Sequence, residues 1–231
     1  MFGNSSRSQR SSGGSPLQVS LLVLVYAAIH SLLASRYAKE AVERLAGKRT
    51  RNGLYRSGFI VQSVVATVWA IWRFQKLPDR DLYCVPKPWS WLWRAMQAAS
   101  VALLASALHT VEIRRILGLP QLGAYLKGGT PEPEPEAQGP ALAPDGRIDA
   151  RGPFRYIRHP DNLPIITLLW SFRRMTVNRL TLACLSTVYA ILGSWHEDSR
   201  MRRRYGRPFE EYKRTMPMLL PRHGGSKRLS A

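Results

Sequence analysis

The chain reads Gly152-Pro153-Phe154-Arg155-Tyr156-Ile157-Arg158-His159-Pro160 directly before an apolar run. A second polar cluster, which contains Glu197 and Asp198, follows directly after another apolar run. The first cluster supplies cations and the second supplies carboxylates, and both stand where hydrophobic segments meet polar sequence. Together they predict a site for a polar, zwitterionic molecule at a membrane surface.

Further apolar runs extend on both sides of these clusters. There are five in all, at residues 17–33, 57–72, 95–111, 163–172 and 180–195. A helix that spans a bilayer needs roughly 20 predominantly apolar residues, so the fourth run is too short to span alone. The fourth and fifth runs therefore predict a helical hairpin that turns at residues 173–179. The expected fold class is all-α: a polytopic integral membrane protein with about five membrane segments. A soluble helical protein with buried core helices is the alternative.

The positive charge of the chain is unevenly distributed. Lys and Arg number 34 against 15 Asp and Glu, which gives a net charge of +19. Connections between the runs alternate between seven, seven and ten cations and two, five and three. Cytoplasmic loops carry such an excess, and anionic lipid attracts it. The pattern predicts an inner or plasma membrane protein with an outside N-terminus and with both clusters and the C-terminus in the cytoplasm. It leaves no need for a nucleic-acid partner.

Composition divides the chain into five segments. We expect a disordered tail at 1–15, membrane helices over 16–127, a Pro/Glu-rich flexible insertion at 128–150, a C-terminal half at 151–221 and a basic tail at 222–231. The insertion alternates Pro and Glu, and this pattern excludes a helix. Two cysteines without CxxC spacing give no zinc signature, so no metal is expected.

The polar clusters suggest specific roles. Arg158 and His159 could hold an anionic group, and Asp161 could cap the short helix that follows. Glu197 or Asp198 could bind an amine or a ribose hydroxyl, if the fifth helix continues past them. The alternative is that the cations are ordinary membrane anchors and that neighbouring arginines compensate the acidic pair. His30 and His109, inside or at the end of apolar runs, are either functional or neutral and hydrogen-bonded.

Both clusters resemble the C-terminal half of the isoprenylcysteine carboxyl methyltransferase superfamily. The family pattern is G-P-[YF]-R-x-x-R-H-P, a helical hairpin, and then an acidic pair followed by F/Y-G and Tyr, which here ends at Tyr212. The segment Ile29-His30-Ser31-Leu32-Leu33-Ala34-Ser35 looks like the bacterial NnrU and methanethiol S-methyltransferase branch. The chain departs from the pattern at Asn162, where the family has Tyr, at Pro164, where it has Gly, and at Asp198, the second acidic residue, which is shorter.

The resemblance implies a membrane-embedded methyltransferase that uses S-adenosylmethionine and acts on a small thiol or lipophilic acceptor. It implies Arg158 and His159 as catalytic residues. The residues implied to bind the cofactor are Tyr156, Arg158, His159, Pro160, Asn162, Glu197, Asp198 and Tyr212.

Three other functions compete with this reading. The departures at Asn162 and Pro164 favour a non-catalytic NnrU-like accessory membrane protein. A related arginine-histidine-proline motif occurs in membrane reductases of the sterol-reductase type, although this chain is short for one. A soluble nucleic-acid binder is the third. The sequence alone does not name the methyl acceptor.

Overall fold

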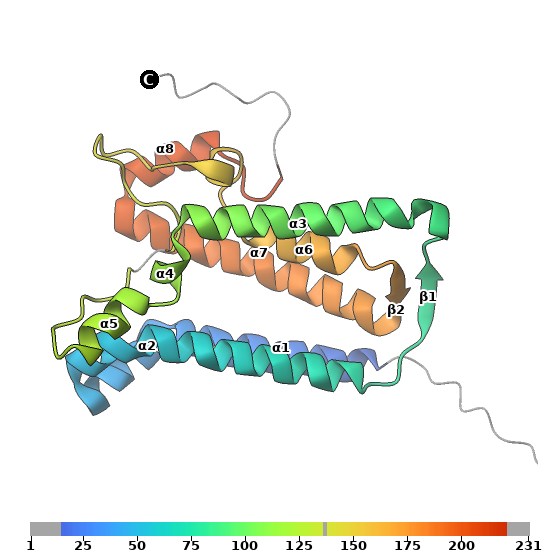
Figure 1. Cartoon of the computed structure of the whole chain (residues 1–231), viewed down its shortest axis with the longest axis horizontal. Coiled ribbons are helices and arrows are strands. Elements are labelled where there is room, and N and C mark those ends of the chain that lie inside the picture. Colours follow the sequence, from blue (N-terminus) through green and yellow to red (C-terminus); the bar gives the residue numbers. More distant parts are fainter. Residues whose placement is uncertain (1–14, 136–137, 221–231) are drawn as a thin grey trace, which may run out of the picture.

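The computed structural model describes residues 15–135 and 138–220 and is mostly helical (Figure 1). The long helices are α1 (Pro16–Ala34), α2 (Arg36–Gln75), α3 (Ser90–Thr110) and α7 (Val177–Tyr205). Shorter helices are α4 (Ile113–Ile116), α5 (Leu119–Leu126), α6 (Asn162–Trp170) and α8 (Arg207–Thr215), with 3-10 turns η1 (Lys87–Trp89) and η2 (Gly152–Arg155). The strands β1 (Asp81–Cys84) and β2 (Arg174–Thr176) form one antiparallel pair. The tails predicted at 1–15 and 222–231 lie outside the described residues except for Ser15.

Each apolar run lies in a helix, but the first predicted connection is not a loop. Residues 36–56 form the first half of α2, because Arg, Lys, Glu, Ala and Leu are all strong helix formers. Ser35 begins this helix by accepting a hydrogen bond from the backbone N–H of Ala38. Gly47, with φ of 82°, introduces a kink.

In the part of the chain that the structure describes, α1 and α2 are long and apolar enough to cross a membrane. Only 6% of the apolar window of each helix is buried. Uncovered apolar surface of this extent is typical of a site that contacts a membrane or another protein. The five-segment topology and its sidedness remain predictions.

The helices form two layers with a space between them. The pair α1 and α2 packs together on one side, and α3, α6 and α7 pack on the other (Figure 1). Helix α7 also contacts α1, which joins the two layers. The β1–β2 pair ties the ends of the layers together, and Asp81 accepts two hydrogen bonds from the Arg174 guanidinium, each of 2.6 Å. The predicted turn between the fourth and fifth runs therefore contains a strand.

The prediction that Asp161 caps α6 is wrong. Asp161 has helical dihedral angles, φ −85° and ψ −35°, and its side chain makes no capping hydrogen bond. A capping side chain needs a non-helical, usually extended backbone. Thr176 meets this requirement at the start of α7, where its hydroxyl accepts from the N–H of Arg179 at 3.2 Å.

The described residues of the 128–150 segment lack helix, as predicted, but make extensive contacts. Asn52 of α2 donates to the backbone oxygen of Pro131 at 3.1 Å. Glu134 forms ion pairs with Lys39 and Arg56. At the other end, Ile148 belongs to a buried cluster with residues of α7 and α8, namely Met201, Phe209 and Tyr212. The segment thus connects α2 with the C-terminal helices.

Candidate active site

The two polar clusters of the sequence meet at Asp198. The Arg158 guanidinium donates to both carboxylate oxygens, at 3.3 Å from Nε and 2.9 Å from Nη2. His159 Nε2 lies 2.9 Å from Asp198 Oδ1. Lys213 adds a longer ion pair at 3.5 Å. The side chains of Arg158 and Asp198 are only 8% and 5% exposed, so this is a buried, multiply bonded carboxylate.

The C-terminal segment holds the backbone of the arginine-histidine motif. The N–H of Arg158 donates to the oxygen of Pro217 at 2.9 Å, and the N–H of His159 donates to that of Met218 at 3.1 Å. Arg158 Nη1 also donates to the backbone oxygens of Lys213 and Met216. The residues that follow α8 therefore hold the backbone of the motif through these hydrogen bonds.

Helix α7 places the carboxylates because it continues past the apolar run to Tyr205, as expected for a helix that includes the acidic pair. Burial alone would raise the pKa of Asp198, but the hydrogen bonds from His159 and Arg158 outweigh it and lower the pKa to about 2. Tyr212 donates its hydroxyl to the backbone oxygen of Phe154 at 2.6 Å. Burial raises the pKa of this phenol, so it remains a donor.

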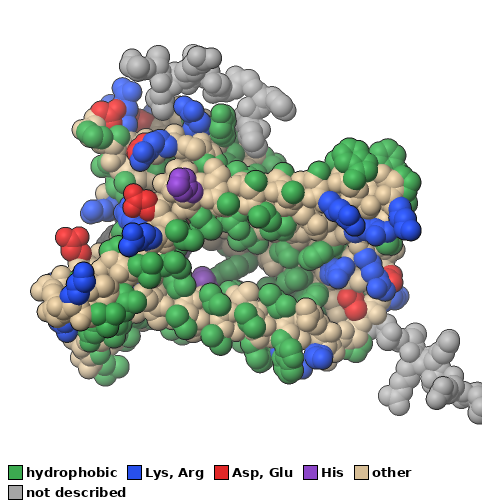
Figure 2. Space-filling view, in the orientation of Figure 1, with side chains coloured by type: hydrophobic (Ala, Val, Ile, Leu, Met, Phe, Trp, Pro, Cys, Tyr) green, Lys and Arg blue, Asp and Glu red, His purple; other side chains and the backbone are tan. Residues whose placement is uncertain are grey.

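A cavity of about 730 Å³ opens beside this network. Its size falls within the range of about 300–1,000 Å³ that is common for small-molecule and cofactor pockets. Figure 2 shows this face of the molecule hollowed between α3 and α2, with hydrophobic side chains on both sides. One end is polar, with Arg158, His159, Asp161, Asn162, Glu197 and Asp198 in its wall. The other end lies between α1, α2 and α7 and is mainly apolar, with Leu22, Val23, Ile71, Phe74 and Leu182 in its wall.

Most of the residues predicted for the site lie in this wall. The residues brought together there are Arg158, His159, Asn162, Glu197, Asp198 and Tyr212. Tyr156 is 63% exposed and lies outside the wall. Pro160 is fully buried and also outside it.

Asn162 and Glu197 each have a specific partner. Asn162 donates its amide to Ser194 Oγ at 2.9 Å. Glu197 accepts a hydrogen bond from the backbone N–H of Gln138 at 2.7 Å and lies 3.6 Å from Arg200. These contacts place a carboxylate and an amide at the polar end of the cavity.

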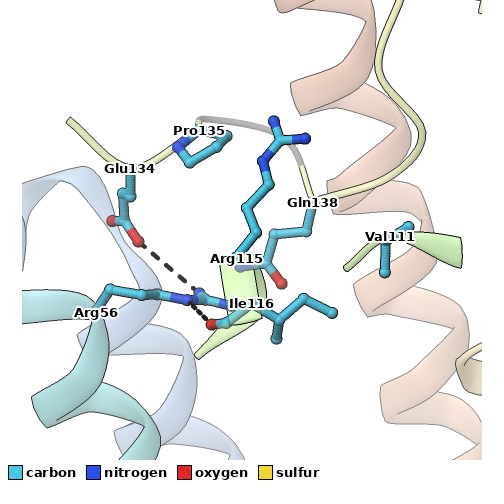
Figure 3. A pocket seen from close by; sticks show the side chains of 7 residues that line it. All are labelled: Arg56, Val111, Arg115, Ile116, Glu134, Pro135 and Gln138. Carbon is cyan, nitrogen blue, oxygen red and sulfur yellow. Dashed lines mark hydrogen bonds and ion pairs between the residues drawn. The ribbon is translucent and has the colours of Figure 1, made fainter. Parts of the chain in front are cut away.

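A network at the rim of the cavity was not predicted from the sequence. Arg56 of α2 donates to the backbone oxygen of Ile116 at 2.6 Å and forms an ion pair of 3.9 Å with Glu134 (Figure 3). These groups line a small pocket, and Gln138, Val111 and Ile116 line both it and the large cavity. Glu134 is distant in sequence from the residues of α2 that it pairs with, and the alternation of Pro and Glu does not predict this contact.

Three polar side chains lie together at the apolar end of the cavity, and the sequence analysis did not predict that they would meet. They are Tyr26 and His30 of α1 and Tyr189 of α7. His30 stood out as an ionisable residue inside an apolar run, but the tyrosines did not. Their position inside predicted spanning segments, away from the interfacial zone where Tyr is common, was the available signal.

The architecture and the site define a mostly helical protein with an amphipathic cavity of ligand size. The sequence model described as NnrU protein matches residues 18–222, and the chain belongs to this family. No solved structure matches the chain.

Curated relatives are methyltransferases by name. Methanethiol S-methyltransferase 2 of Bradyrhizobium diazoefficiens is 23% identical over 214 residues, which cover 90% of this chain and 77% of that protein. The methanethiol S-methyltransferase of Pseudomonas deceptionensis is 22% identical over 201 residues, covering 87% and 71%. That of Mycobacterium tuberculosis is 24% identical over 216 residues, covering 90% and 79%. These similarities support a methyltransferase-like function.

Proposed function

We propose that this protein is a membrane-embedded methyltransferase that uses S-adenosylmethionine to methylate a small thiol such as methanethiol. The observation that carries the proposal is the continuous cavity of about 730 Å³, which joins a charged end to an apolar end. A charged methyl donor and a small apolar acceptor require these two environments in contact. The names of the relatives supply the acceptor class.

The residues of the polar end fit such a donor. S-adenosylmethionine carries a sulfonium, an ammonium group and sugar hydroxyls, and carboxylates are suitable partners for all of these. Glu197 and Asp161 both present carboxylates to the cavity. Protein atoms surround Asp161 and raise the pKa of its carboxyl, although its surface remains accessible from the cavity side. A bound cation would lower this pKa again, because it favours the ionised form of the carboxyl, and the ionised carboxylate would in turn attract the cation.

In this proposal Arg158 and His159 shape the site and do not pair directly with a charge of the donor. Asp198 already binds both side chains, so they form a rigid wall whose position depends on that carboxylate. Asn162 supplies an amide at the same end, and Tyr212 packs beside it with its hydroxyl committed to Phe154. A preorganised wall aligns bound groups without reorganising during the reaction.

Bound S-adenosylmethionine would supply a methyl group whose bond to sulfur breaks as a thiolate forms the new S–C bond, the electron pair staying on the donor sulfur, after the thiol has given its proton to a base in the site. The thiol must lose its proton to react as the thiolate, so the site needs a proton acceptor as well as alignment. The apolar walls around Phe154, Met201 and Phe209 exclude water from this region.

The exposed apolar faces of α1 and α2 support the membrane setting of this proposal. We place both clusters and the C-terminus on the cytoplasmic side, where the cation-rich connections lie. The acceptor enters from the bilayer through the hollow between α2 and α3 (Figure 2).

A second candidate is a non-catalytic NnrU-like accessory membrane protein. The hydrogen bond from Asn162 to Ser194 favours it, because the amide that replaces the family's Tyr is already committed within the protein. Pro164, which replaces the family's Gly, is fully buried in α6.

Calorimetry with S-adenosylmethionine on detergent-purified protein tests the proposal. The variant Glu197→Gln keeps an oxygen to accept the hydrogen bond from Gln138 but removes the charge. We expect micromolar binding by the wild type and a loss of at least about tenfold in the variant, which equals about 1.4 kcal/mol. Glu210→Gln, which changes an exposed carboxylate on α8, is the matched control and keeps full affinity.

Methyl transfer is measured separately as dimethyl sulfide formed from methanethiol, by gas chromatography. Folded wild-type protein that neither binds S-adenosylmethionine nor forms dimethyl sulfide would reject the enzyme and favour the accessory protein.

A further inference from the structure

The apolar end of the cavity contains a small set of polar groups that the charged end does not use. Tyr26 and His30 come from α1, and Tyr189 comes from α7. All three lie inside the predicted spanning runs. Polar groups in such positions are costly, and an ionisable one is a functional candidate by default.

Each of the three side chains is held by one partner. Tyr189 Oη lies 3.1 Å from Ser31 Oγ, and Tyr26 Oη lies 3.0 Å from Thr67 Oγ1. A phenol hydroxyl can donate one hydrogen bond and accept others, so neither tyrosine has exhausted its capacity.

Ring contacts fix the orientation of His30. Its centroid lies 5.8 Å from that of Tyr26 in a stacked arrangement and 5.0 Å from that of Phe59. Its Nδ1 lies 3.4 Å from Ser63 Oγ. Nε2 has no hydrogen-bond partner within residues 15–135 and 138–220.

Helix α7 connects this group directly with the charged end. Tyr189, Gly193 and Glu197 are four residues apart and share one face, so Tyr189 and Glu197 are separated by about 12 Å along the axis. All three line the cavity. A side chain at Gly193 would meet nothing within 4 Å, so the cavity is open between the two ends. A donor held at Glu197 would therefore extend its reactive end towards Tyr189.

We infer that Tyr26, His30 and Tyr189 form the acceptor subsite, which takes a small thiol with a short apolar substituent. The inference rests on the proposed function and adds the residues that select and orient the acceptor. A thiolate in apolar surroundings needs hydrogen-bond donors to offset its lost hydration. The Tyr189 hydroxyl is such a donor, since Ser31 can donate to its oxygen. The Tyr26 hydroxyl donates to Thr67, whose own proton goes to the backbone oxygen of Ser63, so Tyr26 contributes its ring and an acceptor oxygen. Leu22, Val23 and Ile71 surround the substituent.

The thiol proton passes to Nε2 of His30. A second cavity of about 70 Å³ lies against His30 and Ser63 and is also lined by Gln62. The Oε1 atom of Gln62 is buried and has no hydrogen-bond partner in the described chain. A space of this size with polar groups in its wall can hold water, which gives the proton a route away from His30.

The variants Tyr189→Phe and His30→Gln test the subsite, because both nearly preserve side-chain size. We expect both to bind S-adenosylmethionine within about twofold of the wild type by calorimetry. Tyr189→Phe should raise the KM for methanethiol by at least about tenfold. His30→Gln should lower kcat by about tenfold to a hundredfold, because it removes the proton acceptor.

Matched controls are Tyr83→Phe on β1 and His109→Gln at the end of α3, since both side chains are exposed and lie outside the cavity wall. Both controls should keep wild-type KM and kcat. The inference is overturned if Tyr189→Phe and His30→Gln keep wild-type kinetics, which would make their hydrogen bonds purely structural. Loss of S-adenosylmethionine binding in the same variants would also overturn it. A wild type that binds the donor but methylates no thiol removes the subsite alone, whereas one that binds nothing removes the proposed function.

Discussion

Replacing Asp198 by Asn removes the carboxylate that binds both Arg158 and His159. The two side chains keep their places in the wall, but the Asn amide offers one oxygen where the carboxylate offered two. The bidentate contact of Arg158, at 3.3 and 2.9 Å, cannot then persist together with the 2.9 Å contact of His159. Arg158 would remain buried without a counter-ion of comparable proximity.

The expected cost follows from the burial of the pair. Removing one partner of a buried ion pair destabilises a protein by about 3–5 kcal/mol. The pKa of Asp198 gives an independent, smaller value: its fall from 3.8 to about 2 corresponds to about 2 kcal/mol. The larger figure applies to the substitution, since it also leaves the guanidinium unpaired.

Thermal unfolding in detergent measures this loss. For a chain of this length, 1 kcal/mol shifts Tm by about 2–4 °C, so we expect a drop of roughly 6–20 °C. Asp81→Asn is the matched control, because Asp81 also binds an Arg guanidinium through two hydrogen bonds but on the exposed surface. Its Tm should be nearly that of the wild type. Equal shifts in the two variants would refute the reasoning.

The same carboxylate gives an acid dependence of stability. Its pKa is lower in the folded than in the unfolded chain, so the unfolded state binds the proton more readily. The stabilisation is therefore complete above about pH 4 and is lost as pH falls towards about 2. Asp198→Asn should flatten this part of a Tm-versus-pH curve, and an unchanged slope would contradict the assignment.

Four further substitutions probe packing, capping and a buried hydrogen bond through Tm. Gly53→Ala should destabilise the protein by about 1–3 kcal/mol, because the new Cβ would lie 2.6 Å from Tyr125. Gly58→Ala in the same helix places its Cβ against nothing within 4 Å and should stabilise the protein by about 0.5–1 kcal/mol. The same sign in both variants would count against the α2–α5 contact. Thr176→Ala should cost about 0.5–2 kcal/mol through loss of the α7 cap, and no loss would show that the cap is not formed. Tyr212→Phe should cost about 1–3 kcal/mol by orphaning a buried carbonyl, and a neutral result would contradict that hydrogen bond.

The positions of the helices that contain the five apolar runs were largely predictable, because apolar composition extends through α1, α3 and α6 and through parts of α2 and α7. The connection at 36–56 was predicted as a loop since it is polar. Helix formation does not require apolar residues, however, and Ala, Glu, Lys and Arg all favour it. The prediction that Asp161 caps α6 was wrong for a different reason. Residue type alone suggests a cap, but capping depends on backbone angles that the packing of α6 determines.

Their opposite charges predicted that the cationic and acidic clusters would meet. The sequence did not predict which of the two adjacent carboxylates would bind Arg158 and His159. Glu197 and Asp198 are adjacent, and neighbours on a helix point about 100° apart. The rotation of α7 turns Asp198 towards Arg158 and His159, and leaves Glu197 beside Gln138. That rotation depends on contacts of α7 with α1, α6 and α8, which are distant in sequence.

The pairing of the motif backbone with Pro217 and Met218 has a consequence for biosynthesis. A ribosome makes the chain from its N-terminus, so every helix that the structure describes is made before these two residues are. Until then, the N–H groups of Arg158 and His159 lack the carbonyls that they bond in the finished fold. The site is therefore complete only after Pro217 and Met218 have been added, and a nascent chain stopped before Met216 carries the whole arginine-histidine-proline motif without the backbone groups that hold it.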